Sequence, residues 1–130
     1  MGSDKPKVLV EIGGKPILRH LIDSIKASGA DGVPVVVVNR DGGAVRDAFG
    51  SECEYAVQEE PLGTGHAVMS AESAVGETDA VIVLYGDHPF VSQDALRRLV
   101  EIHSASSSVV TIMTAMVPSF EGWYSAFLHW

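Results

Sequence analysis

Two short segments of the chain carry residue types that could bind a nucleotide. The first is residues 58–67, with the sequence Gln-Glu-Glu-Pro-Leu-Gly-Thr-Gly-His-Ala. Its glycines let the backbone approach a ligand closely, and a helix that begins there would present free N–H groups and the positive end of its dipole. This setting suits a phosphate or a base. An ordinary strand-to-helix turn, with Thr64 as a cap and His66 packed or capping, explains the loop alone more simply.

The second segment is Tyr85-Gly86-Asp87-His88-Pro89, which follows an apolar run. In open α/β sheets, ligands bind beyond the carboxyl ends of the strands, so Asp87 would stand at a binding edge. Mg²⁺ prefers one or two carboxylates together with substrate phosphates, and Asp87 suits that role. A turn that Asp87 merely caps is an equally good interpretation. No second His or Cys lies at ligand spacing from His88, so a zinc site is not expected.

A third candidate is Lys7, which follows Lys5 and Pro6 at the start of the first apolar segment. A lysine ammonium can act as a point charge on a phosphate, and Pro6 would restrict the direction in which Lys7 points. Taken without its neighbours in space, Lys7 is more simply interpreted as a solvated lysine.

The hydrophobic pattern predicts the elements that would position these residues. Apolar residues recur at helical spacing over residues 17–25, and Ser92 is placed to cap a later helix. Runs typical of strands alternate with further helical patterns, which favours an α/β domain with a mostly parallel sheet. The expected strands are residues 33–38, 53–57, 79–85 and 108–116. Residues 117–130 are rich in aromatic side chains and are left unassigned.

The composition excludes several classes of protein. A chain of 130 residues, 46% of them hydrophobic, suits one globular domain, and its net charge of −8 disfavours non-specific binding to nucleic acid. Cys53 is the single cysteine, so no intrachain disulfide can form and a cytoplasmic location is the default expectation. The longest apolar run, residues 33–38, is too short to span a membrane, and residues 1–7 do not look like a signal peptide.

Together these segments resemble the sugar-1-phosphate nucleotidyltransferases, and among them the uridylyltransferase domains that act on N-acetylglucosamine-1-phosphate. The resemblance covers roughly residues 1–115, and the Leu-Gly-Thr-Gly-His-Ala loop is its most specific part. Four segments match in order: Met1-x-Ser3-x-x-Pro6-Lys7-x-Leu9, Gly14-Lys15-Pro16 with His20 and Asp23, residues 58–67, and Tyr85-Gly86-Asp87-x-Pro89.

The resemblance implies a Rossmann-like nucleotide-diphospho-sugar transferase fold, incomplete in this chain, and a role for each matching residue. The implied reaction is uridylyl transfer from UTP to N-acetylglucosamine-1-phosphate, which gives UDP-N-acetylglucosamine and pyrophosphate by positioning and charge neutralisation. Lys7 would lie against the phosphates, and Asp87 would hold the bridging Mg²⁺. The remaining implied contacts are Gln58, Leu62, Gly63 and Thr64 at the uracil, and Tyr85 and Gly86 on the sugar side.

The chain also departs from the family pattern. The family begins with a strand and the loop Leu-Ala-Ala-Gly-x-Gly-Thr-Arg, which would hold the triphosphate, and it continues beyond residue 130 with sugar-binding residues and an asparagine that shares the metal. We therefore expect residues 1–130 to be a partial nucleotidyltransferase domain, from an internal fragment or a truncated reading frame, that is inactive alone. The alternatives are a non-enzymatic nucleotide-binding or regulatory module and a gene product without independent function.

The missing strand also has a structural consequence. In the family it lies between the strands at residues 33–38 and 80–85, so these two strands would be free to pair directly here. We expect a marginally stable chain that is prone to associate, because the exposed strand edges carry unpaired N–H and C=O groups. An oligomer is compatible with the sequence.

Overall fold

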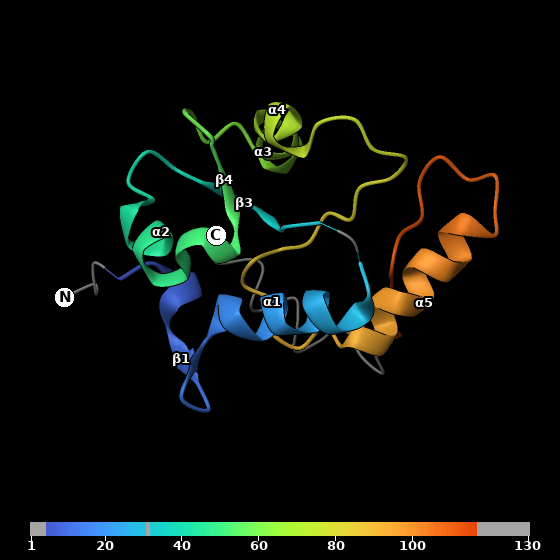
Figure 1. Ribbon diagram of the computed structural model, residues 1–130, viewed down its shortest axis with the longest axis horizontal. Helices are drawn as coiled ribbons and strands as arrows, with labels where there is room; N and C mark the ends of the chain where they lie inside the picture. Colours follow the sequence, from blue (N-terminus) through green and yellow to red (C-terminus); the bar gives the residue numbers. More distant parts are fainter. Residues whose placement is uncertain (1–4, 31, 117–130) are drawn as a thin grey trace. The chain divides into compact units, whose positions relative to one another are not determined.

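The structure, a computed structural model, describes residues 5–30 and 32–116 (Figure 1). The chain divides into two compact units, Met1–Arg97 and Arg98–Trp130, and the boundary falls within helix α5 (Gln93–Ser104). The expectation that residues 1–130 form one partial domain stays a prediction. Within the described residues, no helix combines the length and the apolar character that a membrane crossing requires.

The first unit begins with a 3-10 turn and a small hairpin. The turn η1 (Lys7–Leu9) leads to the antiparallel pair β1 (Glu11–Ile12) and β2 (Lys15–Pro16). Gly13 and Gly14 join the two strands with φ of +60° and +77°, a two-residue turn that requires positive φ at both positions and therefore favours glycine.

Helix α1 (Ile17–Ser28) supplies one face of the core. It begins directly after Pro16 and ends at Gly29, whose φ of +83° is the left-handed conformation that terminates many helices. Its expected apolar face is confirmed, because Ile17, Leu18, Leu21 and Ile22 are all buried.

A parallel βαβ unit packs against this helix. Strand β3 (Val35–Val38) continues through α2 (Gly43–Phe49) and η2 (Gly50–Glu52) to β4 (Glu54–Val57), and Val38 pairs with Val57 in parallel register. Figure 1 shows the two strands side by side. The core cluster combines α1 with these elements, and burial raises the pKa of its one thiol, Cys53. Its buried members are Leu9, Leu18, Leu21, Ile22, Val38, Val45, Phe49 and Cys53.

The remaining helices follow β4. They are α3 (Thr64–Ser70), α4 (Glu72–Val75) and α5, which Ser92 caps as expected by accepting a hydrogen bond from the Ala95 N–H at 3.2 Å. The α/β fold class, with a small parallel sheet and flanking helices, is therefore confirmed. It is partial, because each sheet in the described ranges has two strands.

Two expected strands are wrong. Residues 79–85 and 108–116 form no strand, although both are strongly apolar. The expectation that residues 33–38 and 80–85 pair directly is also wrong, because β3 pairs with β4 alone in the part of the chain that the structure describes. A strand requires a ladder partner for its N–H and C=O groups, and apolar composition does not provide one. The unassigned residues 117–130 lie outside the described residues.

Candidate functional site

The loop after β4 is closed by the side chain of Gln58. This residue directly follows the strand, and its backbone N–H donates to the Val38 carbonyl at 2.8 Å. Its side-chain Nε2 donates to the Gly63 carbonyl at 3.0 Å and lies 3.1 Å from Nδ1 of His66. Both Gln58 and His66 are partly buried. The loop is therefore held in shape by one amide side chain that contacts its far end twice.

The start of α3 differs from expectation in one detail. Thr64 is the first residue of the helix rather than its cap, and Gly63 occupies the cap position with φ of +101°. An amino acid with a side chain rarely adopts that φ, so glycine is the suitable residue here. Leu62, Gly63 and Thr64 are all exposed, so this stretch of backbone is open to a ligand.

A second cluster joins the two ends of the first unit. Nζ of Lys7 donates to Oδ2 of Asp87 at 2.9 Å, across 80 positions of sequence. The Lys7 ammonium holds the pKa of the Asp87 carboxyl below its usual value, chiefly through this hydrogen bond, while partial burial opposes the shift. The Asp87 side chain keeps 35% of its surface exposed. Asp87 is therefore ionised at neutral pH, as a carboxylate metal ligand must be, and it is partly exposed.

Tyr85, Gly86 and His88 adjoin Asp87 in the sequence. The rings of Tyr85 and His88 lie 5.2 Å apart between centroids, and Nε2 of His88 is 3.8 Å from Oδ1 of Asp87. A methyl group at Gly86 would meet Val8 at 3.6 Å and Leu18 at 3.7 Å, which are ordinary contacts. Packing alone therefore does not demand glycine at position 86.

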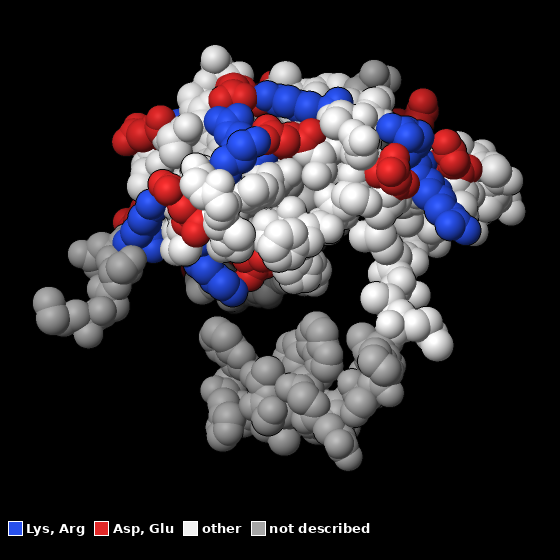
Figure 2. Space-filling model, turned by 90° about the horizontal axis from the view of Figure 1, so that it is seen from below, with Lys and Arg blue, Asp and Glu red and all other residues white. Residues whose placement is uncertain are grey.

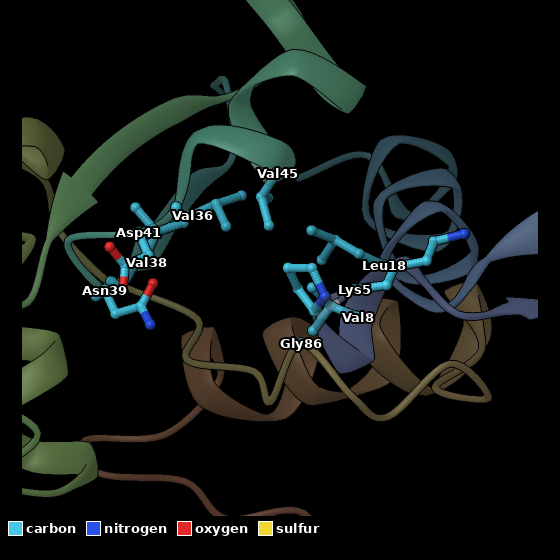
Figure 3. A pocket seen from close by; sticks show the side chains of 12 residues that line it. Lys5, Val8, Leu18, Val36, Val38, Asn39, Asp41, Val45 and Gly86 are labelled. Carbon is cyan, nitrogen blue, oxygen red and sulfur yellow. The ribbon is translucent and has the colours of Figure 1, made fainter. Parts of the chain in front are cut away.

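A cavity of about 500 Å³ lies between β3 and this segment. Figure 3 shows Val38, Asn39 and Asp41 on one side of it, and Val8 and Gly86 on the other. Its walls are mostly aliphatic, and its polar side chains are few. Gly86, which follows the apolar run at residues 79–85, is the one residue of the second segment that lines the cavity.

The structure brings the predicted site residues into two groups, Lys7 with Asp87 and Gln58 with Gly63. No hydrogen bond or ion pair among residues 5–30 and 32–116 joins one group to the other. The sequence alone indicates only a packed or capping role for His66, because its contact with Gln58 depends on the shape of the folded loop. The only signal for it was a polar ring inside the glycine-containing loop.

Asp87 can supply a single carboxylate to a metal. The described residues contain no cluster of three or more His, Cys, Asp and Glu side chains that could hold one. The donor set still fits Mg²⁺, which takes one or two protein carboxylates and completes its shell with water and phosphate oxygens. On the face shown in Figure 2, Lys and Arg side chains lie beside Asp and Glu side chains.

Comparison with known proteins places the chain in a family. Residues 1–122 match the MobA-like NTP transferase domain. The chain is 38% identical over 117 residues to the Bifunctional protein GlmU of Symbiobacterium thermophilum, which covers 88% of this chain and 25% of that protein. The protein of the same name from Heliobacterium modesticaldum is 40% identical over 124 residues, covering 95% and 27%. The one from Clostridioides difficile is 35% identical over 123 residues.

The chain thus spans about a quarter of the length of the curated relatives it matches. The matches confirm the family resemblance that the four sequence segments indicated. With a family match over nearly its whole length, the chain belongs to the MobA-like NTP transferase domain family, a family of nucleotidyltransferases.

Proposed function

We propose that this chain is the nucleotide-binding part of a uridylyltransferase that uses UTP and N-acetylglucosamine-1-phosphate. The observation that carries the proposal is the ion pair between Lys7 and Asp87. It joins a candidate phosphate-binding lysine to a candidate metal-binding carboxylate from opposite ends of the first unit. The likeness of the Gln58 loop to the uridylyltransferases supports uridine over other nucleosides.

In this proposal Lys7 and Asp87 exchange partners when the nucleotide binds. Without a ligand, each neutralises the other at 2.9 Å. With UTP, the Lys7 ammonium turns to a phosphate oxygen, which leaves Asp87 as the carboxylate that would hold Mg²⁺. The metal neutralises charge on the phosphates when it is bound, and the lysine adds a second positive charge beside them. Because 70% of the Lys7 side chain is exposed, this movement meets little steric resistance.

The remaining site residues serve binding and orientation. Gln58 and the exposed backbone at Leu62, Gly63 and Thr64 contact the uracil. Tyr85 and Gly86, which adjoin Asp87, line the side that receives the sugar phosphate. Positioning both substrates in this way supplies much of the rate enhancement that phosphoryl-type transfers need.

We further propose that residues 1–130 bind UTP weakly and do not turn it over. The described residues offer one carboxylate and one lysine to a triphosphate, whereas such transfers draw on several positive charges at once. A chain that binds nucleotide without turnover would also act as the non-enzymatic binding module considered from the sequence.

The test measures UTP binding to the 130-residue chain by calorimetry, with and without Mg²⁺, and pyrophosphate release with N-acetylglucosamine-1-phosphate. We expect Mg²⁺ to strengthen UTP binding, and Asp87→Asn to remove most of that gain, by about tenfold or more, as expected for a lost charged contact. Lys7→Met should weaken binding with or without Mg²⁺.

The matched control is Asp94→Asn, because Asp94 is an exposed carboxylate paired with Arg97 at 3.1 Å on α5. It should leave the Mg²⁺ dependence unchanged. No measurable UTP binding would overturn the proposed function, and a Mg²⁺ effect that survives Asp87→Asn would overturn the role of Asp87. Clear pyrophosphate release would overturn the proposed inactivity of the chain.

A further inference from the structure

Both N–H groups of the Gln58 side-chain amide are used inside the loop. One donates to the Gly63 carbonyl at 3.0 Å, and the other faces Nδ1 of His66 at 3.1 Å. A primary amide has two N–H donors on nitrogen and an acceptor oxygen on the other side of the same carbon. The amide nitrogen has therefore no donor left for a ligand.

These two contacts also determine which nitrogen of His66 carries the proton. The Gly63 carbonyl can only accept, so the amide nitrogen rather than its oxygen must face it. The second N–H then points at Nδ1 of His66, which must accept, so the neutral imidazole carries its proton on Nε2. A rotated Gln58 amide would place its oxygen against the Gly63 carbonyl, and the two acceptors would repel each other.

The amide oxygen is the part of Gln58 that a ligand can use. No residue in the described part of the chain donates a hydrogen bond to it. An accepting oxygen that faces N3 of a pyrimidine, rather than the exocyclic group at C4, discriminates uracil from cytosine. Uracil carries an N–H at N3, whereas cytosine carries a bare acceptor at the same position.

We propose that His66 is a positioning residue that fixes the Gln58 amide with its oxygen toward N3 of the base, and so favours pyrimidines that carry an N–H at that position. The proposal rests on the proposed function, because it assumes that a nucleotide base binds at this loop. It adds the reason why this loop would accept uridine nucleotides and reject cytidine nucleotides. A polar site that leaves its acceptor unpaired, or opposite another acceptor, rejects a ligand strongly.

The test compares binding of UTP, CTP and N3-methyl-UTP to the 130-residue chain with Mg²⁺ present. N3-methyl-UTP keeps the triphosphate and the shape of uracil but has no N–H at N3. We expect UTP to bind at least about fivefold more tightly than either of the others, as expected for one lost hydrogen bond. Equal binding of UTP and CTP would overturn this inference and leave nucleotide binding intact. Absence of binding by all three would overturn the proposed function and the base selection together.

Variants at position 66 separate positioning from simple packing. His66→Phe keeps a ring but removes the acceptor, so the preference for UTP over CTP should fall toward one. His66→Asn places an oxygen near the position of Nδ1 and should restore the preference. Ser70→Ala is the matched control, because the Ser70 hydroxyl donates to the His66 carbonyl at 2.8 Å in the same helix without touching the imidazole. It should leave the preference unchanged.

A nitrogen-detected NMR experiment on the free chain reports the tautomer without any nucleotide. We expect Nδ1 of His66 to carry no proton and Nε2 to carry one. A proton on Nδ1 would overturn the proposal, as would a preference for UTP that persists in full in His66→Phe.

Discussion

Strand β3 and residues 79–85 are both apolar runs, yet only the first forms a strand. β3 has β4 beside it in parallel register, from Val35 opposite Glu54 to Val38 opposite Val57. Residues 79–85 have no such neighbour in the described ranges, and they remain without a ladder. The difference shows that an apolar sequence selects burial, whereas a strand also needs a second backbone at the right distance.

Within residues 79–85, exposed and partly buried side chains nevertheless alternate from Val81 to Tyr85. Ile82 and Leu84 are partly buried, and Leu84 packs against the core cluster, while Val81, Val83 and Tyr85 are exposed. This alternation is typical of a half-buried strand. The side chains are therefore distributed between core and solvent as in a strand, although the backbone forms no ladder.

The largest expected effect is on the free energy of unfolding, when one valine in each apolar run is replaced by aspartate. Val38 keeps 7% of its surface exposed and lies in the core cluster, so Val38→Asp should destabilise the fold by more than about 4 kcal/mol, because it buries an unpaired charge. Val83 keeps 60% of its surface exposed, so Val83→Asp should change the free energy of unfolding by less than about 0.5 kcal/mol. Urea unfolding followed by circular dichroism measures both. Equal losses would show that residues 79–85 are as tightly packed as β3.

A smaller effect concerns the ion pairs between α1 and the segment that precedes β4. Glu52, just before β4, accepts two hydrogen bonds from Arg19 at 2.7 Å and one from Lys26 at 2.8 Å. The hydrogen bonds from Arg19 and then Lys26 lower the pKa of Glu52 from 4.5 to about 2. A carboxyl whose pKa is lowered by folding stabilises the folded state above its unfolded pKa, and this contribution is lost as pH falls.

We therefore expect thermal stability to fall between about pH 4.5 and pH 2, in part through Glu52. Glu52→Gln should make this fall shallower, because the glutamine does not titrate. Asp87 follows residues 79–85, and the hydrogen bond from Lys7 lowers the pKa of its carboxyl as well. Asp87→Asn should therefore also make the loss of thermal stability at acid pH shallower. An unchanged pH profile in Glu52→Gln would show that this network adds nothing to stability.

The smallest expected effect on the fold is a change in association. Residues 79–85 combine exposed valines with backbone groups that lack a ladder, which is a typical template for intermolecular strand pairing. Val83→Lys should therefore lower the concentration-dependent association measured by sedimentation velocity while leaving the melting temperature within a few degrees. Val33→Lys is the comparison on the other run, because Val33 is 51% exposed and precedes β3, which already has a partner strand. If both variants associate as strongly as the original chain, the exposed run at residues 79–85 is not the cause.

The sequence by itself determined the features that depend on neighbours along the chain. These include the apolar face of α1, its end at Gly29, the runs that became β3 and β4, and the cap of α5 at Ser92. Each follows from local periodicity or from the conformational preference of a single residue type. The family match was equally accessible, because it rests on short motifs in a set order.

Only the tertiary structure decided which distant residues meet. It joined Lys7 to Asp87, set the Gln58 amide against Gly63 and His66, and left residues 79–85 without a partner strand. The physical reason is that ion pairs, amide orientation and strand ladders all need a second group at about 3 Å, supplied by another part of the chain. Periodicity shows which face of a segment is apolar, but it carries no information about which group lies opposite.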